Sequence, residues 1–165
     1  MGFKYTSDQF QISASVAESA PNGLATATIN LNLDSLSREI LVIQHVDLDV
    51  TTPDFVAGAT SIMQCSLNDA DVGLGGLSNS QVIAVASNTI VADAAVGGAA
   101  FQNSEPRFAQ MDESPIFVSA TDNLFLSLKG SNNTAATGIA QCRIYARRAR
   151  ADADTYAAIL TAQFN

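Results

Sequence analysis

The sequence EILVIQHVDLDV, residues 39–50, alternates apolar and other side chains over most of its length. A period of two places successive side chains on opposite faces of a strand, so this stretch predicts a β-strand and not a helix. The even-numbered residues form the expected core face, which is interrupted only at Gln44: Ile40, Val42, Val46, Leu48 and Val50. The odd-numbered residues form the expected outer face: Leu41, Ile43, His45, Asp47 and Asp49.

The outer face of this strand carries His45, Asp47 and Asp49, which have the side-chain types of a metal or acid–base site. A metal ion held by His45 and one aspartate would need further ligands from neighbouring strands, and the chain has no second histidine. We therefore expect a strand surface that faces solvent or an interface.

The chain has two cysteines, Cys65 and Cys142. Together with a single histidine they are too few to supply the four ligands of a zinc site, so we expect buried thiols or one long-range disulfide. No cofactor is predicted.

The period of two recurs along the chain between turn residues such as Pro21-Asn22-Gly23. Further strands are predicted at 10–18, 25–34, 61–67, 81–87, 115–120, 123–130 and 138–147. The polar residues 130–138 predict a hairpin connection between the last two strands. In the last strand the expected inward residues are Ala140, Cys142, Ile144 and Ala146, and the expected outward residues are Ile139, Gln141, Arg143, Tyr145 and Arg147.

Two long connections and a helical tail complete the chain. Residues 68–80 and 97–114 lack a clear period and are expected to be long loops that form functional surfaces. The tail changes to a period of three and four, which predicts a helix whose apolar face is Tyr156, Ile159, Leu160 and Phe164. Asp152 and Asp154 lie near its expected start, where a carboxylate can cap a helix. The prediction is one all-β domain over residues 1–165: an antiparallel two-sheet jelly-roll sandwich at about 8–151 and a short C-terminal helix at 152–164.

The composition favours a protein that contacts other subunits. Of the 165 residues, 47% are hydrophobic and only 15% are charged, which leaves much of the surface to neutral polar and small side chains. Burial of such groups costs less than burial of ions, so a surface of this kind suits subunit interfaces. The net charge of −8 argues against a general nucleic-acid binder. No apolar run reaches the roughly 20 residues of a membrane span, so no transmembrane segment is predicted.

The positive charge is concentrated near the end of the last strand. Arg143, Arg147, Arg148 and Arg150 are four of the eight Lys and Arg residues, and Tyr145 lies among them. We expect Arg143, Tyr145 and Arg147 to share one strand face and the other two arginines to continue into the helix. Guanidinium groups beside an aromatic ring can bind phosphates or stack on bases. The alternative, which the excess of acidic residues favours, is pairing with carboxylates of the same or a neighbouring subunit.

Two other parts of the sequence contain residue types that are found in functional sites. Asp69-x-Asp71-x-Gly73 matches the start of a calcium-binding loop but lacks the later acidic ligands, so we expect a solvated turn. No nucleophile lies at a recognisable spacing from His45, and the carboxylates are scattered over loops. The sequence therefore predicts no catalytic residues and a protein that is not an enzyme.

Three segments, EILVIQHVDLDV (39–50), SPIFVSATDNLFLSLKG (114–130) and IAQCRIYARRA (139–149), carry a resemblance to a known class. With the polar, alanine-rich composition, they make the chain similar in pattern to the small single jelly-roll capsid proteins of icosahedral viruses. The resemblance implies a virion protein that assembles with copies of itself into a shell, with packaged nucleic acid or other virion proteins as further partners. Many such proteins begin with an Arg- and Lys-rich arm, whereas this N-terminus has only Lys4.

A second class of function remains open from the residues alone. A carbohydrate- or receptor-binding β-sandwich module, including a decoration or spike protein of a virion, would use the loops at 68–80 and 97–114 as its site. Carbohydrate sites usually display aromatic platforms, and this chain has no tryptophan and only 7% aromatic residues. The composition therefore favours the shell-forming protein.

Overall fold

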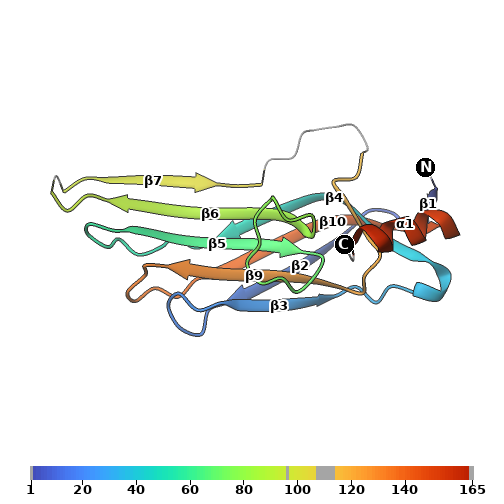
Figure 1. Cartoon of the computed structure of the whole chain (residues 1–165), viewed down its shortest axis with the longest axis horizontal. Coiled ribbons are helices and arrows are strands. Elements are labelled where there is room, and N and C mark those ends of the chain that lie inside the picture. The colour runs from blue at the N-terminus through green and yellow to red at the C-terminus, as the bar shows by residue number, and fades with distance from the viewer. Residues whose placement is uncertain (1, 96, 107–113, 164–165) are drawn as a thin grey trace.

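The computed structural model describes residues 2–95, 97–106 and 114–163 and consists mainly of antiparallel strands (Figure 1). The strands are β1 (Phe3–Tyr5), β2 (Phe10–Ala17), β3 (Ala25–Asn30), β4 (Glu39–Val50), β5 (Thr60–Asn68), β6 (Val82–Ala92), β7 (Ala99–Ser104), β8 (Phe117–Ser119), β9 (Asn123–Ser131) and β10 (Ile139–Ala151). A 3-10 turn, η1, spans Ser35–Ser37, and one helix, α1, spans Ala153–Gln163. Within the described ranges, no helix is long and apolar enough to cross a membrane.

The strands form two sheets that pack face to face. Sheet 1 has the order β2-β10-β4-β8, and the short β1 pairs with the far end of β10. Sheet 2 has the order β3-β9-β5-β6-β7. When β1 and β7 are left aside and the other eight strands are counted along the chain, the orders are 1-8-3-6 and 2-7-4-5. This interleaving of two Greek keys defines a jelly roll, so the predicted fold class is confirmed.

The core lies between the two sheets and comes from the alternating residues that the sequence indicated. In β9 the alternate leucines Leu124, Leu126 and Leu128 are fully buried. Opposite them, β10 contributes the four residues expected to face inward: Ala140, Cys142, Ile144 and Ala146. Cys65 and Cys142 both lie in this core as free thiols. Burial raises the pKa of Cys65 to about 12 and that of Cys142 to about 11, so both thiols are neutral at pH 7 and poor nucleophiles.

Strand β4, whose sequence indicated a β-strand most clearly, contains a β-bulge. Tyr145 lies opposite His45, and the next residue of β10, Ala146, lies opposite Ile43. Gln44 is therefore the extra residue on β4, and the alternation of side chains changes phase at this point. Because of that change, the sequence rule of an even-numbered core face holds on only one side of Gln44.

The bulge corrects the predicted faces of β4. After Gln44 the even-numbered Val46, Leu48 and Val50 face the core between the sheets, as expected. Before it, the odd-numbered Leu41 and Ile43 face that core, although they were expected on the outer face. Ile40 and Val42 are also buried, but on the opposite side of sheet 1.

Helix α1 covers the outer side of sheet 1 at this end. Ile40, Val42 and Ala149 form a small second core with the helix residues Tyr156, Ile159 and Leu160. The predicted apolar face of the helix is confirmed for these three residues, and Phe164 lies outside the described residues. The N-terminus of the helix is capped as expected, since the Asp152 carboxylate accepts a hydrogen bond of 2.8 Å from the Thr155 N–H.

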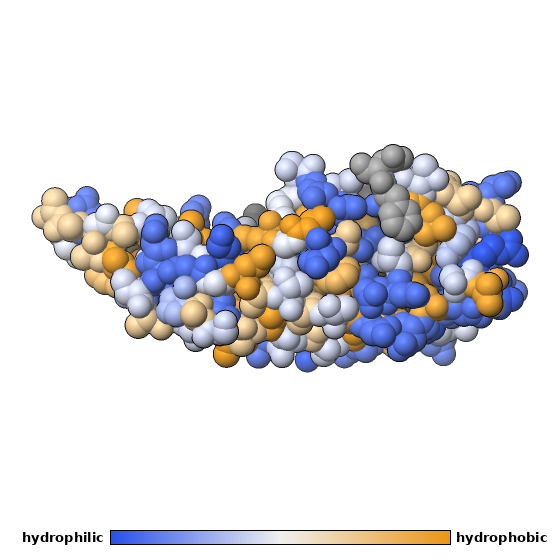
Figure 2. Space-filling model, turned by 60° about the horizontal axis from the view of Figure 1, so that its bottom comes forward, coloured by the Kyte–Doolittle hydropathy of each residue, from blue (hydrophilic) through white to orange (hydrophobic). Residues whose placement is uncertain are grey.

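Two predicted connections differ in the structure. Residues 130–138 do not close a hairpin, because β9 belongs to sheet 2 and β10 to sheet 1, and the segment crosses between the sheets. The range 97–114, expected to be a loop, contains strand β7, which forms a hairpin with β6. Residues 107–113 of that range lie outside the described residues. The β6–β7 hairpin projects beyond the sandwich at the end opposite the helix (Figure 1), and in the surface view this end is mostly pale to orange with a few blue side chains (Figure 2).

Candidate functional site

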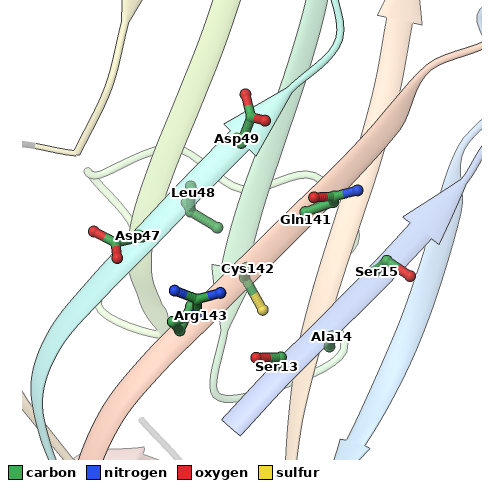
Figure 3. A pocket seen from close by; sticks show the side chains of 9 residues that line it. All are labelled: Ser13, Ala14, Ser15, Asp47, Leu48, Asp49, Gln141, Cys142 and Arg143. Carbon is green, nitrogen blue, oxygen red and sulfur yellow. The ribbon is translucent and has the colours of Figure 1, made fainter. Parts of the chain in front are cut away.

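The outer face of sheet 1 away from the helix is a polar surface built by three neighbouring strands. Cross-strand pairs place Arg143 of β10 between Asp47 of β4 and Ser13 of β2, and place Gln141 between Asp49 and Ser15. These side chains surround a shallow hollow of about 490 Å³ (Figure 3). Ala14, Leu48 and Cys142, which alternate with them on the three strands, complete the lining.

His45 lies on this polar face, as the sequence predicted. Its Nε2 is 2.8 Å from an oxygen of Asp47, and both side chains are about half exposed. The His45 ring also lies 5.7 Å from the ring of Tyr145 across the strand pair. Within the described ranges, no group of three or more His, Cys, Asp and Glu side chains is placed to hold a metal ion.

The arginines of β10 do not form one cluster. Arg143, Tyr145 and Arg147 share the outer face of sheet 1, as expected. Arg148 and Arg150 lie in β10, which continues to Ala151, so the expectation that they continue into the helix is wrong. Since side chains alternate along a strand, these two arginines point to the opposite side of the sheet.

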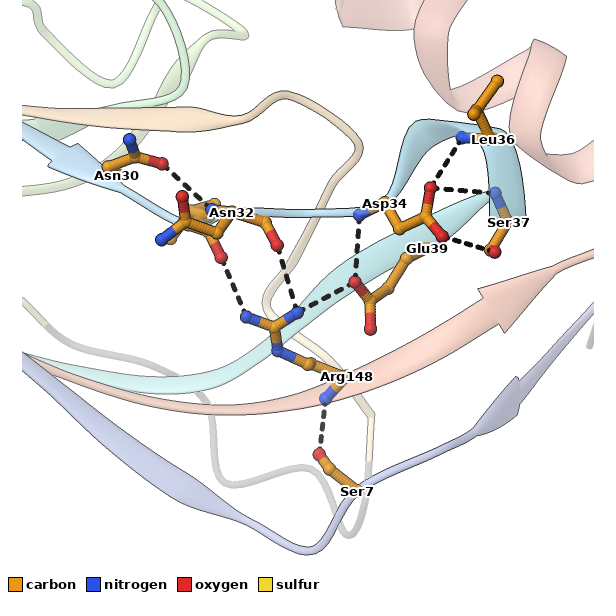
Figure 4. Close-up of polar contacts among 9 residues, drawn as sticks. Ser7, Asn30, Asn32, Asp34, Leu36, Ser37, Glu39 and Arg148 are labelled. Carbon is orange, nitrogen blue, oxygen red and sulfur yellow. Dashed lines mark hydrogen bonds and ion pairs between the residues drawn. The ribbon is translucent and has the colours of Figure 1, made fainter.

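Arg148 connects the rims of the two sheets (Figure 4). Its Nη1 donates to a Glu39 oxygen at 2.8 Å, and its Nη2 donates to the Leu31 carbonyl at 2.8 Å. The same Glu39 oxygen accepts the Asp34 N–H at 3.0 Å. Asp34 caps the turn η1 by accepting the N–H groups of Leu36 and Ser37 and the Ser37 hydroxyl, and the hydrogen bonds from Ser37 hold its pKa below the usual value. The Arg148 side chain therefore connects segments of its own chain and has a structural role.

The other three arginines of β10 differ in their surroundings. The Arg147 guanidinium lies 4.0 Å from the centre of the Tyr5 ring, and its Nε donates to the Ser7 carbonyl. This geometry is a cation–π contact that holds β1 against the sheet. Arg143 and Arg150 are exposed. Of the candidate arginines, these two present their charge most openly to a partner.

The predicted solvated turn at Asp69 and Asp71 is half right. Asp71 is exposed, but Asp69 is buried at the end of β5, where it accepts hydrogen bonds from the hydroxyls of Ser119 and Thr121. Burial raises the pKa of Asp69 to about 6, although the two hydroxyl groups oppose this rise. Asp69 therefore links sheet 2 to the end of β8 and to Thr121 just after it, and its carboxylate is buried whereas Asp71 is exposed.

Two further carboxylates that sequence reasoning did not select hold the crossing segment 130–138. Buried Glu18 accepts the N–H groups of Gly130 at 2.6 Å and Gly138 at 2.7 Å. Asp54 accepts three consecutive backbone N–H groups, at residues 134–136, which hold its pKa below the usual value. The only sequence signal of these roles is an acidic residue near a strand end, and that signal is too general to identify a partner.

Comparison with known proteins gives structural likeness alone. No protein-family model and no curated protein sequence matches this chain. Among solved structures, VP1 of Trichodysplasia spinulosa-associated polyomavirus in complex with 3'-sialyllactose is similar over 90% of this chain and 97% of that chain, at 10% identity and a TM-score of 0.42. The same VP1 without a glycan gives 10% identity and 0.41 over 90% and 99%.

A third similar structure is an unassembled VP1 pentamer of Washington University polyomavirus, with 8% identity and a TM-score of 0.36 over 86% of this chain and 93% of that chain. At such identities and scores, these structures carry no argument about function or kinship. The assignment of the fold depends on the strand order of the chain itself. That order is the jelly roll, with one C-terminal helix packed on the outer side of sheet 1.

Proposed function

We propose that this protein is the shell-forming structural protein of a small icosahedral virus and assembles with copies of itself through its jelly-roll domain. The observation that carries the proposal is the strand order 1-8-3-6 against 2-7-4-5, an arrangement used by viral capsid domains and by some lectins. The sequence resemblance in residues 39–50, 114–130 and 139–149 favours the capsid member of that pair.

The surface chemistry supports assembly. Only 15% of the residues are charged, and strands β2, β3 and β7 contain no charged residue at all. Neutral polar and small side chains can be buried between subunits at a lower desolvation cost than ions. Strands of this composition suit a chain that contacts many copies of itself. The location of the protein in this proposal is the virion.

The arginines of β10 serve subunit structure in this proposal more than genome binding. Arg147 and Arg148 are already engaged with Tyr5, Ser7, Glu39 and the Leu31 carbonyl of their own chain. Arg143 lies across the strand pair from Asp47 within an acidic surface. Phosphate binding would therefore depend mainly on Arg143 and Arg150, and two dispersed charges give little affinity for nucleic acid.

A second candidate function is glycan or receptor binding at the hollow on sheet 1. Its lining combines Arg143, Asp47, Asp49 and Gln141, whose planar polar groups can hydrogen-bond sugar hydroxyls (Figure 3). Tyr145 and His45 add aromatic rings beside it. The volume of about 490 Å³ falls within the usual range for small-ligand sites. This candidate moves the predicted site from the loops to the strands.

Electron microscopy of the purified chain distinguishes the two functions. The chain would be expressed alone, separated by density-gradient centrifugation and imaged directly from the gradient fractions. Closed particles of uniform size are the expected result for a shell protein. A folded chain that remains monomeric in every fraction and binds a glycan, with binding lost in Arg143→Ala, would contradict the shell proposal and support the second candidate.

A further inference from the structure

Strand β7 is an edge strand without a buried residue. All six of its residues, Ala99–Ser104, are exposed. The edge strands β2 and β3 instead place alternate residues against the core. Among the described residues, β7 pairs only with β6, so the N–H and C=O groups along its other edge have no strand partner there.

The hairpin formed by β6 and β7 exposes apolar side chains on both of its faces. Phe101 is opposite Ile90, and Val91 is opposite Ala100, so Phe101 and Val91 point to opposite faces. Phe101 is 59% exposed and Val91 is 45% exposed. Strand β6 is held on its other side by β5, and Asn88 and Ala92 of β6 are buried, whereas β7 adds only exposed side chains. A partner that covers the exposed apolar side chains would therefore stabilise this edge.

The chemistry of this edge selects a second copy of the same chain. Unpaired main-chain groups are completed by another strand, which adds to the sheet edge. Edge strands are commonly guarded against such pairing by charged residues or proline, and β7 contains neither. Two chains that each carry a net charge of −8 repel one another, but residues 88–104 contain a single charged side chain, Asp93. The hairpin is thus a place where two copies can approach with little repulsion.

We infer that β7 pairs antiparallel with β7 of a second copy about a two-fold axis, so that sheet 2 continues from one subunit into the next. This inference rests on the proposed self-assembly. A two-fold axis normal to a sheet keeps every side chain on its own face, so one residue of β7 must lie opposite its own copy. Centring the pair on Phe101 aligns residues 99–103 and brings two exposed aromatic rings together, a favourable cross-strand pair. Ala100 of one copy then lies opposite Gln102 of the other.

Single cysteines on β7 test this register while leaving Phe101 intact. Ala100→Cys and Gln102→Cys are prepared separately, and the native Cys65 and Cys142 are buried and do not compete. Under mild oxidation each variant alone should stay uncross-linked, whereas a mixture of the two should form a disulfide-linked dimer. Cross-linking of each variant with itself to the same extent as in the mixture, or none in any sample, would overturn the inference.

A charge placed on the edge gives a second readout. Phe101→Lys should abolish assembly while the isolated subunit keeps the wild-type circular dichroism and melting temperature, because Phe101 is exposed. Leu36→Lys, at a 96% exposed residue of η1, is the matched control and should assemble normally. Normal assembly of Phe101→Lys would contradict the pairing of β7 with a second copy but would not contradict the shell proposal. A wild-type chain that never assembles would instead remove the shell proposal.

Discussion

Arg148 of β10 and Glu39 of β4 form an ion pair of 2.8 Å at the rim of the sandwich, with both side chains less than half exposed. The guanidinium also donates to the Leu31 carbonyl, so it joins sheet 1 to the chain that leaves β3. A cation chosen from the sequence as a possible genome contact is therefore a structural residue. Its surroundings lead directly to a stability prediction.

Arg148→Gln should lower the free energy of unfolding by about 2 kcal/mol, because Glu39 and the Leu31 carbonyl lose a charged hydrogen-bond donor. Arg143→Gln, at an exposed residue of the same strand and on its other face, should change it by less than about 0.5 kcal/mol. Urea denaturation followed by circular dichroism measures both. Equal and small effects of the two substitutions would show that the Arg148 network does not stabilise the subunit.

Val46→Asp should prevent soluble folding, since Val46 is 2% exposed in the core and a carboxylate there has no partner. Replacing the neighbouring residue on the exposed face, His45→Ala, should cost less than about 1 kcal/mol, because the pair that His45 forms with Asp47 lies at the surface. Soluble yield and thermal melting of the two variants are the measurements. If His45→Ala lost its fold and Val46→Asp kept it, then His45 and not Val46 would face the core, and the assignment of faces in β4 after the bulge would be wrong.

Asp69 should make stability fall as the pH rises from about 4 to about 6. Its folded-state pKa of about 6 exceeds the ordinary 3.8, so the protonated carboxyl is favoured in the folded chain and ionisation favours unfolding. The stabilisation is complete below pH 4 and is lost as the pH passes 6; a shift of this size corresponds to about 3 kcal/mol. Denaturation midpoints of wild type and Asp69→Asn at pH 4 and pH 7 measure it.

In that experiment, Asp69→Asn should be more favourable relative to wild type at pH 7 than at pH 4, because the amide cannot ionise. Asp71→Asn, a change at an exposed carboxylate of the same loop, is the matched control. A difference between Asp69→Asn and wild type that stays constant with pH would mean that Asp69 does not titrate in this window.

Loss of helix α1 should expose the second core. Deleting residues 153–165 uncovers Ile40, Val42 and Ala149 on sheet 1, and the truncated chain should bind a hydrophobic dye and aggregate. A milder comparison uses Ile159→Glu, on the packed face, and Ala158→Glu, on the exposed face. Only the first should lower the melting temperature. A soluble truncated chain without dye binding would show that the helix does not protect this surface.

The sequence predicted most of the strands and the main core, because one buried face leaves a clear period of two in segments such as 123–130 and 138–147. The bulge could not be predicted from the sequence of β4, since Gln44 is an extra residue only with respect to the partner strand β10. Strand β7 was missed for a different reason: none of its residues is buried, so burial imposes no alternation on its sequence.

The candidate site was predicted less well than the fold. Alternation placed Arg143 and Tyr145 on the outer face correctly, because that depends on local geometry alone. The role of Arg148 depends on the Leu31 carbonyl, and the burial of Asp69 depends on Ser119 and Thr121. These partners lie 50 or more residues away along the chain, and their proximity follows from the interleaved strand order.

The most direct test of the central claim is the mass of the purified wild-type chain in solution, measured by size-exclusion chromatography with light scattering. A jelly-roll shell protein should elute as a homogeneous species in the megadalton range and should show the β-sheet circular dichroism of the folded chain. A folded chain whose mass stays at that of one or two copies over the accessible range of salt and pH would contradict the proposed function.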